Sequence, residues 1–143
     1  MNIYQEHVMD HYKHPRNRGS LEGPDYTLTD SNPQCGDEIT VYFAVKDGKI
    51  EQAKNFTQGC AVSQAAASML FEKLEGTKVD DLLQMDKQEI LDEFGTELSV
   101  SRVKCALLAL NASKKALLRK PEDLVMDTAG ARNDEEKQLN KER

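Results

Sequence analysis

The sequence predicts an α+β fold, in which an N-terminal helix precedes a small three-stranded antiparallel sheet and several C-terminal helices pack on one face of that sheet. Three observations predict it. Apolar and polar side chains alternate along residues 38–45, as in a half-buried strand. Asp47-Gly48 follows, and this pair is a preferred two-residue turn of a β-hairpin. From residue 61 onward, helix start and stop signals replace the strand pattern.

The first half of the chain supplies one helix and three strands. Residues 2–13 carry a weak apolar stripe, and this helix ends at His14-Pro15 because the residue before a proline disfavours helical geometry. The hairpin turn joins the strand at 38–45 to a second strand at 49–57. Residues 26–30 are the expected third strand, at the edge of the sheet.

The second half of the chain supplies helices with recognisable ends. Polar capping residues open them, and glycine ends two of them. The expected helices are 61–75 before Gly76, a short one opened by Thr77-x-x-Asp80, one from the capping-box pattern Asp86-x-x-Glu89 to Gly95, and a long one from Ser99 to about Leu118, with Pro121 beyond it.

Length and composition fit one modest globular domain. The chain has 143 residues, of which 38% are hydrophobic and 31% are charged. We expect a single domain over residues 1–126 and a disordered polar tail over 127–143. No apolar run approaches the ~20 residues that span a bilayer, and the N-terminus lacks the apolar core of a signal peptide. The sequence therefore predicts a cytoplasmic protein with no membrane partner.

The net charge of −6 is unevenly distributed. Residues 72–97 hold nine acids and three bases, whereas residues 99–120 hold six bases and no acid. Such blocks are usually solvated helix faces. The overall acidity argues against nucleic acid as a partner.

The cysteines at 35, 60 and 105 are odd in number, which argues against a closed disulfide framework. In a reducing compartment, cysteines far apart in sequence are expected to act as metal ligands or nucleophiles, although a buried inert thiol is the common alternative. A two-residue turn pairs residue 46 with 49, and this register carried to the open end of the hairpin sets Cys35 opposite Cys60. Asp37 faces the same side as Cys35.

The long helix that contains Cys105 is expected to pack on this side of the sheet. Cys35, Asp37, Cys60 and Cys105 are therefore predicted to form one metal–sulfur site. Thiolates suit zinc and iron–sulfur clusters, and a carboxylate completes a set of four ligands. Structural zinc sites mostly use Cys and His in CxxC-type pairs, which this chain lacks. An exchangeable oxygen ligand indicates a site that releases what it holds, and we expect zinc or iron in the as-isolated protein.

Four segments, in order, carry a further pattern. They are Tyr4…His11-Tyr12-x-x-Pro15-Arg16-Asn17-x-Gly19, then Asn32-Pro33-Gln34-Cys35-Gly36-Asp37, then Gly59-Cys60-Ala61-Val62-Ser63-Gln64-Ala65-Ala66-Ala67-Ser68-Met69, and Ser101-Arg102-Val103-Lys104-Cys105. Across about residues 3–118, the chain resembles the IscU/NifU/SufU family of iron–sulfur cluster assembly scaffolds.

The resemblance implies a three-stranded antiparallel sheet with packed helices. It also implies that the protein accepts sulfur from a PLP-dependent cysteine desulfurase, builds a transient [2Fe–2S] cluster and passes it to recipient apoproteins. Cys35, Cys60 and Cys105 match the family's thiolate ligands and sulfur acceptors. Asp37 matches the residue that keeps the bound cluster labile.

A sulfur acceptor must be a thiolate when it attacks. We choose Cys105, because the ammonium of Lys104 lowers the pKa of this thiol if it points inward, and because the helix is basic. Cys60 is the second choice: it precedes the helix at 61–75, whose dipole favours a thiolate, but small neighbours suggest tight packing around it.

Two features depart from the family's pattern. Lys104 stands where IscU-type members have a histidine, as in SufU-type members, yet the 44 residues between Cys60 and Cys105 are too few for the SufU-type insertion. After the long helix the chain reads Leu118-Arg119-Lys120-Pro121-Glu122 rather than Leu-Pro-Pro-Val-Lys, the element that Hsp70 chaperones recognise in IscU types. The sequence therefore disfavours an Hsp70 partner and leaves the subtype open.

Three functions remain open: a cluster scaffold or carrier, a zinc-dependent sulfurtransferase of the SufU type, and a structural zinc protein. The sequence does not decide whether the protein is an enzyme, or whether the cluster is held in one chain or in a homo-oligomer. His7, His11 and His14 recur at helical spacing, and we interpret them as surface and packing residues rather than metal ligands.

Overall fold

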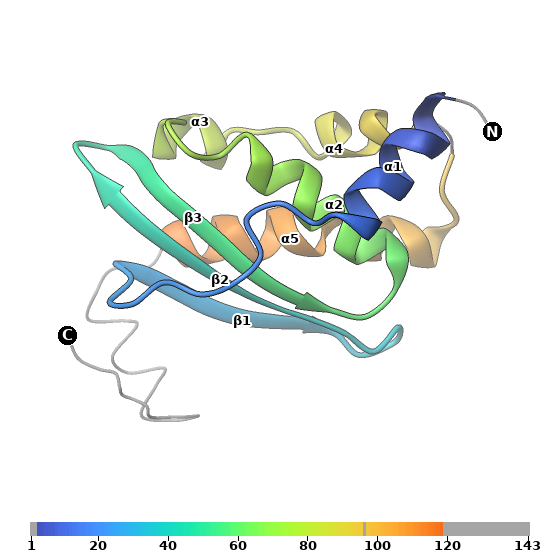
Figure 1. Cartoon of the computed structure of the whole chain (residues 1–143), viewed down its shortest axis with the longest axis horizontal. Helices are drawn as coiled ribbons and strands as arrows, with labels where there is room; N and C mark the ends of the chain where they lie inside the picture. Colours follow the sequence, from blue (N-terminus) through green and yellow to red (C-terminus); the bar gives the residue numbers. More distant parts are fainter. Residues whose placement is uncertain (1–2, 96, 119–143) are drawn as a thin grey trace.

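The computed structural model of the protein describes residues 3–95 and 97–118. Figure 1 shows one helix before three strands, and further helices after them. The elements are α1 (Ile3–Lys13), β1 (Tyr26–Asn32), β2 (Asp37–Lys46), β3 (Lys49–Gln58), α2 (Ala61–Glu72), α3 (Val79–Leu83), α4 (Lys87–Phe94) and α5 (Val100–Leu118). The predicted α+β class is confirmed.

The sheet has the strand order β1-β2-β3, and both neighbouring pairs are antiparallel. Its central strand shows the alternation that the sequence predicted. Asp37, Ile39, Val41 and Phe43 are buried on the face toward the helices, and the residues between them are more exposed. One face of the sheet is therefore the floor of the core.

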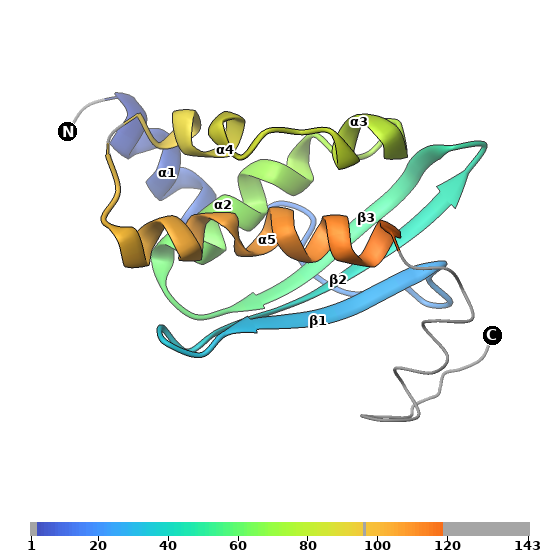
Figure 2. The same ribbon diagram turned by 180° about the vertical axis from the view of Figure 1, so that it is seen from behind.

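Helices α2 and α5 cover this face, and α1, α3 and α4 lie beyond them (Figures 1 and 2). The core joins β-branched and aromatic residues of the sheet to small and apolar residues of the two covering helices. The rings of Phe43 and Phe71 stack across this interface with centroids 5.6 Å apart. Within the described ranges, no helix combines the length and hydropathy needed to cross a membrane.

The element boundaries differ slightly from those predicted. The edge strand β1 continues to Asn32, two residues beyond its expected end, while α2 ends at Glu72 and not at 75. The capping box at Asp86 and Glu89 is confirmed, and Gly95 ends α4 in the left-handed conformation with φ of 67°. The expected tail at 127–143 lies outside the described residues.

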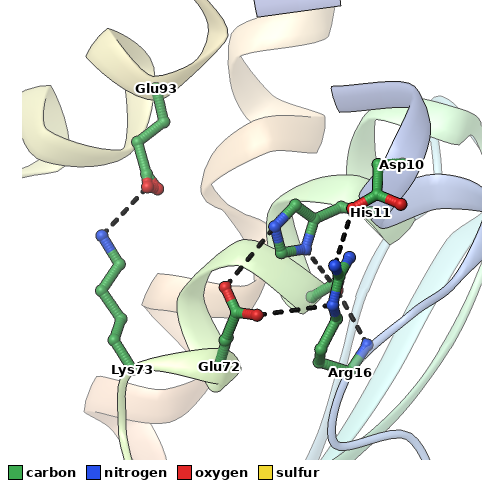
Figure 3. Close-up of polar contacts among 7 residues, drawn as sticks. Asp10, His11, Arg16, Glu72, Lys73 and Glu93 are labelled. Atoms are coloured by element: carbon green, nitrogen blue, oxygen red, sulfur yellow. Dashed lines mark hydrogen bonds and ion pairs between the residues drawn. The ribbon is translucent and has the colours of Figure 1, made fainter. Parts of the chain in front are cut away.

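A polar network centred on the buried His11 fastens α1 to α2 (Figure 3). His11 is 2% exposed, its Nδ1 lies 2.7 Å from Ser68 Oγ, and its Nε2 lies 3.6 Å from Glu72 Oε1. The backbone N–H of Arg16 donates to the same Ser68 oxygen at 2.9 Å. This arrangement lets the Ser68 hydroxyl donate to a neutral His11 whose proton is on Nε2, facing Glu72. The guanidinium of Arg16 closes the network by contacting Glu72 and Asp10.

Burial lowers the pKa of His11 from its usual value, the nearby charge of Arg16 lowers it further, and Glu72 opposes both. The unfolded chain therefore binds a proton at this residue before the folded protein does. Stability contributed by neutral His11 is present above the unfolded-state pKa of about 6.5, and it is lost as the pH falls through and below that value.

We predict that urea unfolding will show a smaller loss of stability between about pH 8 and about pH 5.5 in His11→Asn than in the wild type. The asparagine carbonyl can still accept the Ser68 hydroxyl proton, but it does not titrate. Both proteins are measured in the same metal-loading state, and far-UV circular dichroism follows their unfolding. An equal pH dependence in the two proteins would contradict the prediction.

Candidate metal centre

Cys35 lies in the turn that joins β1 to β2. The ladder between these strands ends with the pair Asn32 and Asp37, so residues 33–36 make the connection. The backbone N–H of Cys35 donates to the carbonyl oxygen of Asn32 at 3.1 Å. Gly36 has φ of 70°, in the left-handed region that glycine favours. The turn holds the half-buried thiol of Cys35 beside the first residue of β2.

Asp37 is an ionisable residue at the end of the core face, and it is 1% exposed. Its Oδ1 accepts the backbone N–H of Cys60 at 2.8 Å, across the sheet from β2 to the start of α2. A buried carboxylate is costly without such a partner. This hydrogen bond therefore fixes the carboxylate beside the second cysteine.

Gly59 makes the approach of Asp37 possible. A Cβ atom placed on Gly59 would lie 2.1 Å from Asp37 Oδ1 and 2.8 Å from its Cα, far inside contact distance. Gly59 also has φ of 138°, which L-residues rarely adopt. Any side chain here would displace the carboxylate or the turn between β3 and α2.

Cys60 is the N-cap residue of α2. Its sulfur accepts the backbone N–H of Ser63 at 3.4 Å and lies 3.7 Å from Asp37 Oδ2. A sulfur in this position satisfies a free amide of the first helical turn. The thiol is half-buried, so it remains within reach of solvent.

Cys105 closes the site from α5, and its side chain is fully buried. Its sulfur, the sulfur of Cys35 and a carboxylate oxygen of Asp37 all lie within 4.8 Å of one another. The sulfur of Cys60 is not among these three atoms, but it contacts the carboxylate of Asp37. The structure thus brings the four predicted residues to one end of the sheet.

Burial is the main cause that raises the pKa of the Cys105 thiol, and the three other groups of the site raise it further. Thiolate and carboxylate groups that lie close together repel one another unless a positive charge compensates them. A soft divalent cation supplies that charge and accepts these donors, so the donor set fits a metal ion.

Lys104, next in sequence to Cys105, is exposed. Its Nζ lies 3.5 Å from Oε1 of Gln34, which precedes Cys35 in the turn. Burial and the three other residues of the site all raise the pKa of Cys105, and Lys104 is not among the groups that shift it. The condition set by the sequence, an inward-pointing lysine, is not met in this arrangement.

The predicted pairing of Cys35 with Cys60 is one residue out of register. Lys46 pairs with Lys49 and Val45 with Ile50, as expected, but an irregularity between Ala44 and Val45 shifts every later pair by one residue. The ladder ends at Glu38 with Gln58, which sets Asp37 beside Gly59. The bulge has a signal in the sequence, because Glu51 and Gln52 are two consecutive polar residues in β3.

Sequence reasoning missed Asn32 and Ser63 as residues that shape the site, and at Gly59 it expected tight packing around Cys60 but not the contact with Asp37. None has ligand chemistry of its own, and each contributes through a contact that depends on the fold. The histidines were interpreted correctly in one respect, since His11 is a buried packing residue. Among the residues that the structure describes, the candidate metal-binding groups of three or more ligands include no histidine.

Comparison with known proteins gives one family and several relatives. The family model of the NifU-like N-terminal domain matches residues 3–122. "Iron-sulfur cluster assembly scaffold protein IscU 1" of Archaeoglobus fulgidus is 35% identical over 116 residues, covering 81% of this chain and 75% of the relative. "Zinc-dependent sulfurtransferase SufU" of Bacillus subtilis is 32% identical over 135 residues, covering 82% of this chain and 90% of the relative.

A solved structure is similar over the same region. It is the crystal structure of a Fervidobacterium islandicum protein described as a scaffold for the SUF system of iron–sulfur cluster assembly. The two share 27% sequence identity with a TM-score of 0.66, over 78% of this chain and 94% of that one.

We predict that Gly59→Ala will lower zinc affinity by roughly 10- to 100-fold, because the added methyl group displaces Asp37. Gly19→Ala is the matched control, since Gly19 has φ of 141° but a Cβ atom placed on it would meet no atom within 4 Å. Competition with a chromogenic chelator measures the affinity. A Gly59→Ala affinity equal to that of Gly19→Ala would contradict the prediction.

Proposed function

The chain belongs to the family of NifU-like N-terminal domains, that of the IscU, NifU and SufU proteins, and we propose on this premise that it is an iron–sulfur cluster assembly scaffold. It accepts sulfur from a cysteine desulfurase, assembles a [2Fe–2S] cluster and passes it to apoproteins. The observation that carries the proposal is the convergence of Cys35, Asp37 and Cys105, with Cys60 bound to Asp37, at one end of the sheet.

Each protein ligand has a role that its surroundings support. Cys105 and Asp37 are buried and form the floor of the site, whereas Cys35 and Cys60 are half-buried and lie on connections between elements. When bound, a zinc or iron ion keeps the thiols deprotonated. A cluster held by the outer two cysteines remains within reach of a partner, which suits cargo that must be received and released.

The sulfur-accepting step needs one thiolate. The acceptor attacks the outer sulfur of the desulfurase persulfide, a new S–S bond forms, and the desulfurase cysteine leaves as a thiolate, so no outside oxidant is required. Cys105 remains our choice of acceptor, and its burial adds a condition: its sulfur must become exposed when the desulfurase binds. Cys60, the second choice, needs no such movement because it is half-buried.

Asp37 is the proposed exchange point. A carboxylate is the hardest ligand in a set otherwise made of soft sulfurs, so it forms the weakest bond to a metal–sulfur cargo. Its hydrogen bond to the Cys60 backbone gives the oxygen a second partner at 2.8 Å. The carboxylate can therefore leave the cluster without becoming an unpaired buried charge.

The second candidate is a zinc-dependent sulfurtransferase in the same pathway. Two observations favour it: Lys104 in the SufU-type position, and the Bacillus subtilis relative that covers 82% of this chain. A structural zinc protein is less well supported, because two of the thiols are half-buried and one ligand is an oxygen. Anaerobic reconstitution with Fe²⁺, cysteine, a desulfurase and dithiothreitol separates these functions, since only a scaffold acquires [2Fe–2S] absorption and passes it to an apo-ferredoxin.

We predict that Asp37→Ala will slow cluster transfer to apo-ferredoxin while preserving or lengthening the lifetime of the bound cluster. The variant lacks the hard ligand that opens the coordination shell. Absorption and circular dichroism follow transfer in time, with Asp30→Ala as the control because Asp30 pairs with Lys115 away from the site. Transfer at the wild-type rate would remove Asp37 from the release step.

We predict that Cys105→Ser will lose most of the persulfide formed with desulfurase and cysteine, and that Cys60→Ser will retain it. Mass spectrometry of the intact protein counts the added sulfur, and Lys104→Ala tests the lysine separately. Persulfide on Cys105→Ser at the wild-type rate would transfer the role to Cys60 or Cys35. An unchanged rate in Lys104→Ala would agree with its position at the surface beside Gln34.

A further inference from the structure

Asn32 contacts or neighbours each of Cys35, Asp37 and Cys105, the three residues whose candidate ligand atoms lie within 4.8 Å of one another. It is the last residue of β1, and its partner across the ladder is Asp37. Its carbonyl oxygen accepts the backbone N–H of Cys35 at 3.1 Å. Its side chain is buried, and its Nδ2 lies 3.8 Å from the sulfur of Cys105. The sulfur-accepting and cluster-releasing steps do not use this side chain.

We propose that Asn32 is a positioning residue of the metal centre, whose side-chain amide donates a hydrogen bond to the sulfur of Cys105. This inference rests on the proposed metal–sulfur function. The amide sets the direction in which the Cys105 sulfur points and takes up part of the negative charge that the sulfur carries when it binds a metal ion.

The chemistry of the amide supports this role. Of its two polar atoms, only Nδ2 can donate, and an anionic sulfur can only accept. Hydrogen bonds to ligand sulfurs are among the features that tune metal–sulfur centres, and partners outside the ligand set hold the ligands in orientation. Asn32 and Asp37 stand side by side on the inner face, so one strand pair supplies both a ligand and a donor to another ligand.

The simpler interpretation is that Asn32 only shapes the turn that contains Cys35. That task belongs to its backbone carbonyl, which any residue retains. The side-chain amide instead contacts Cys105 of α5, outside the turn. A substitution of the side chain therefore separates the two roles.

The test uses Co²⁺, which binds zinc sites and reports its sulfur ligands through sulfur-to-cobalt charge-transfer absorption. Full-length wild type, Asn32→Leu, Asn32→Asp and Ser31→Ala are titrated anaerobically with Co²⁺. Leucine has a similar size without a donor, aspartate has the same shape with an oxygen in place of the N–H, and Ser31 is the exposed neighbour on β1. Far-UV circular dichroism establishes that each variant is folded.

We expect Asn32→Leu and Asn32→Asp to bind Co²⁺ about 10- to 100-fold more weakly than the wild type. Their charge-transfer band moves to lower energy, because a sulfur without the hydrogen bond holds its electrons less tightly. Ser31→Ala keeps the wild-type affinity and band. If Asn32→Leu does not fold, the isosteric Asn32→Asp carries the comparison alone.

An unchanged band energy in folded Asn32 variants would overturn the inference and leave the proposed function intact. This holds even if their Co²⁺ affinity fell, because a purely structural role changes affinity without changing the electron density on the Cys105 sulfur. A wild-type protein that shows no sulfur-to-cobalt band would overturn the metal site itself, and this inference with it. The two failures are therefore distinguishable.

Discussion

The hydrogen bond from the Cys60 backbone to the Asp37 carboxylate is the contact on which the rest of the metal centre depends. A carboxylate that is 1% exposed is stable only with a partner, and this partner is the backbone amide of the residue that caps α2. Gly59 leaves the space for it. Because the thiol of Cys60 also caps α2, this one junction sets where β2 begins, where α2 begins and how close two ligands lie.

The four candidate ligands divide into a fixed floor and an accessible rim. Asp37 and Cys105 belong to a strand and a helix that pack in the core, whereas Cys35 and Cys60 occupy a turn and a helix cap. Regular elements open less readily than turns. Under the proposed function, a partner that brings or removes cargo meets the rim first, and the floor keeps the geometry of the site while the rim rearranges.

Helix α2 connects this centre to the N-terminal helix. Cys60 stands at its start, and Ser68 and Glu72 lie further along it, where they meet His11 and Arg16. The small residues between them allow α2 to lie close against the sheet and α5. A change that loosens α1 therefore acts on the element that positions Cys60, although α1 itself supplies no ligand.

The sequence by itself determined the α+β class, the hairpin at Asp47-Gly48 and both ends of α4, because these follow from side-chain period and local backbone preference. It placed the start of α3 at Thr77, whereas Lys78 is the N-cap residue there. It also named the four candidate ligands that the structure brings to one end of the sheet, since thiols and a carboxylate have few other uses in such a pattern. Only the tertiary structure decided the register at the site, because the bulge between Ala44 and Val45 shifts the pairing of β2 and β3 by one residue, so that Cys35 does not face Cys60 as expected. Likewise it decided the burial of Cys105, the outward position of Lys104 and the contact of Asn32. Each of these last three depends on how α5 sits on the sheet, which is a matter of long-range packing that no local pattern encodes.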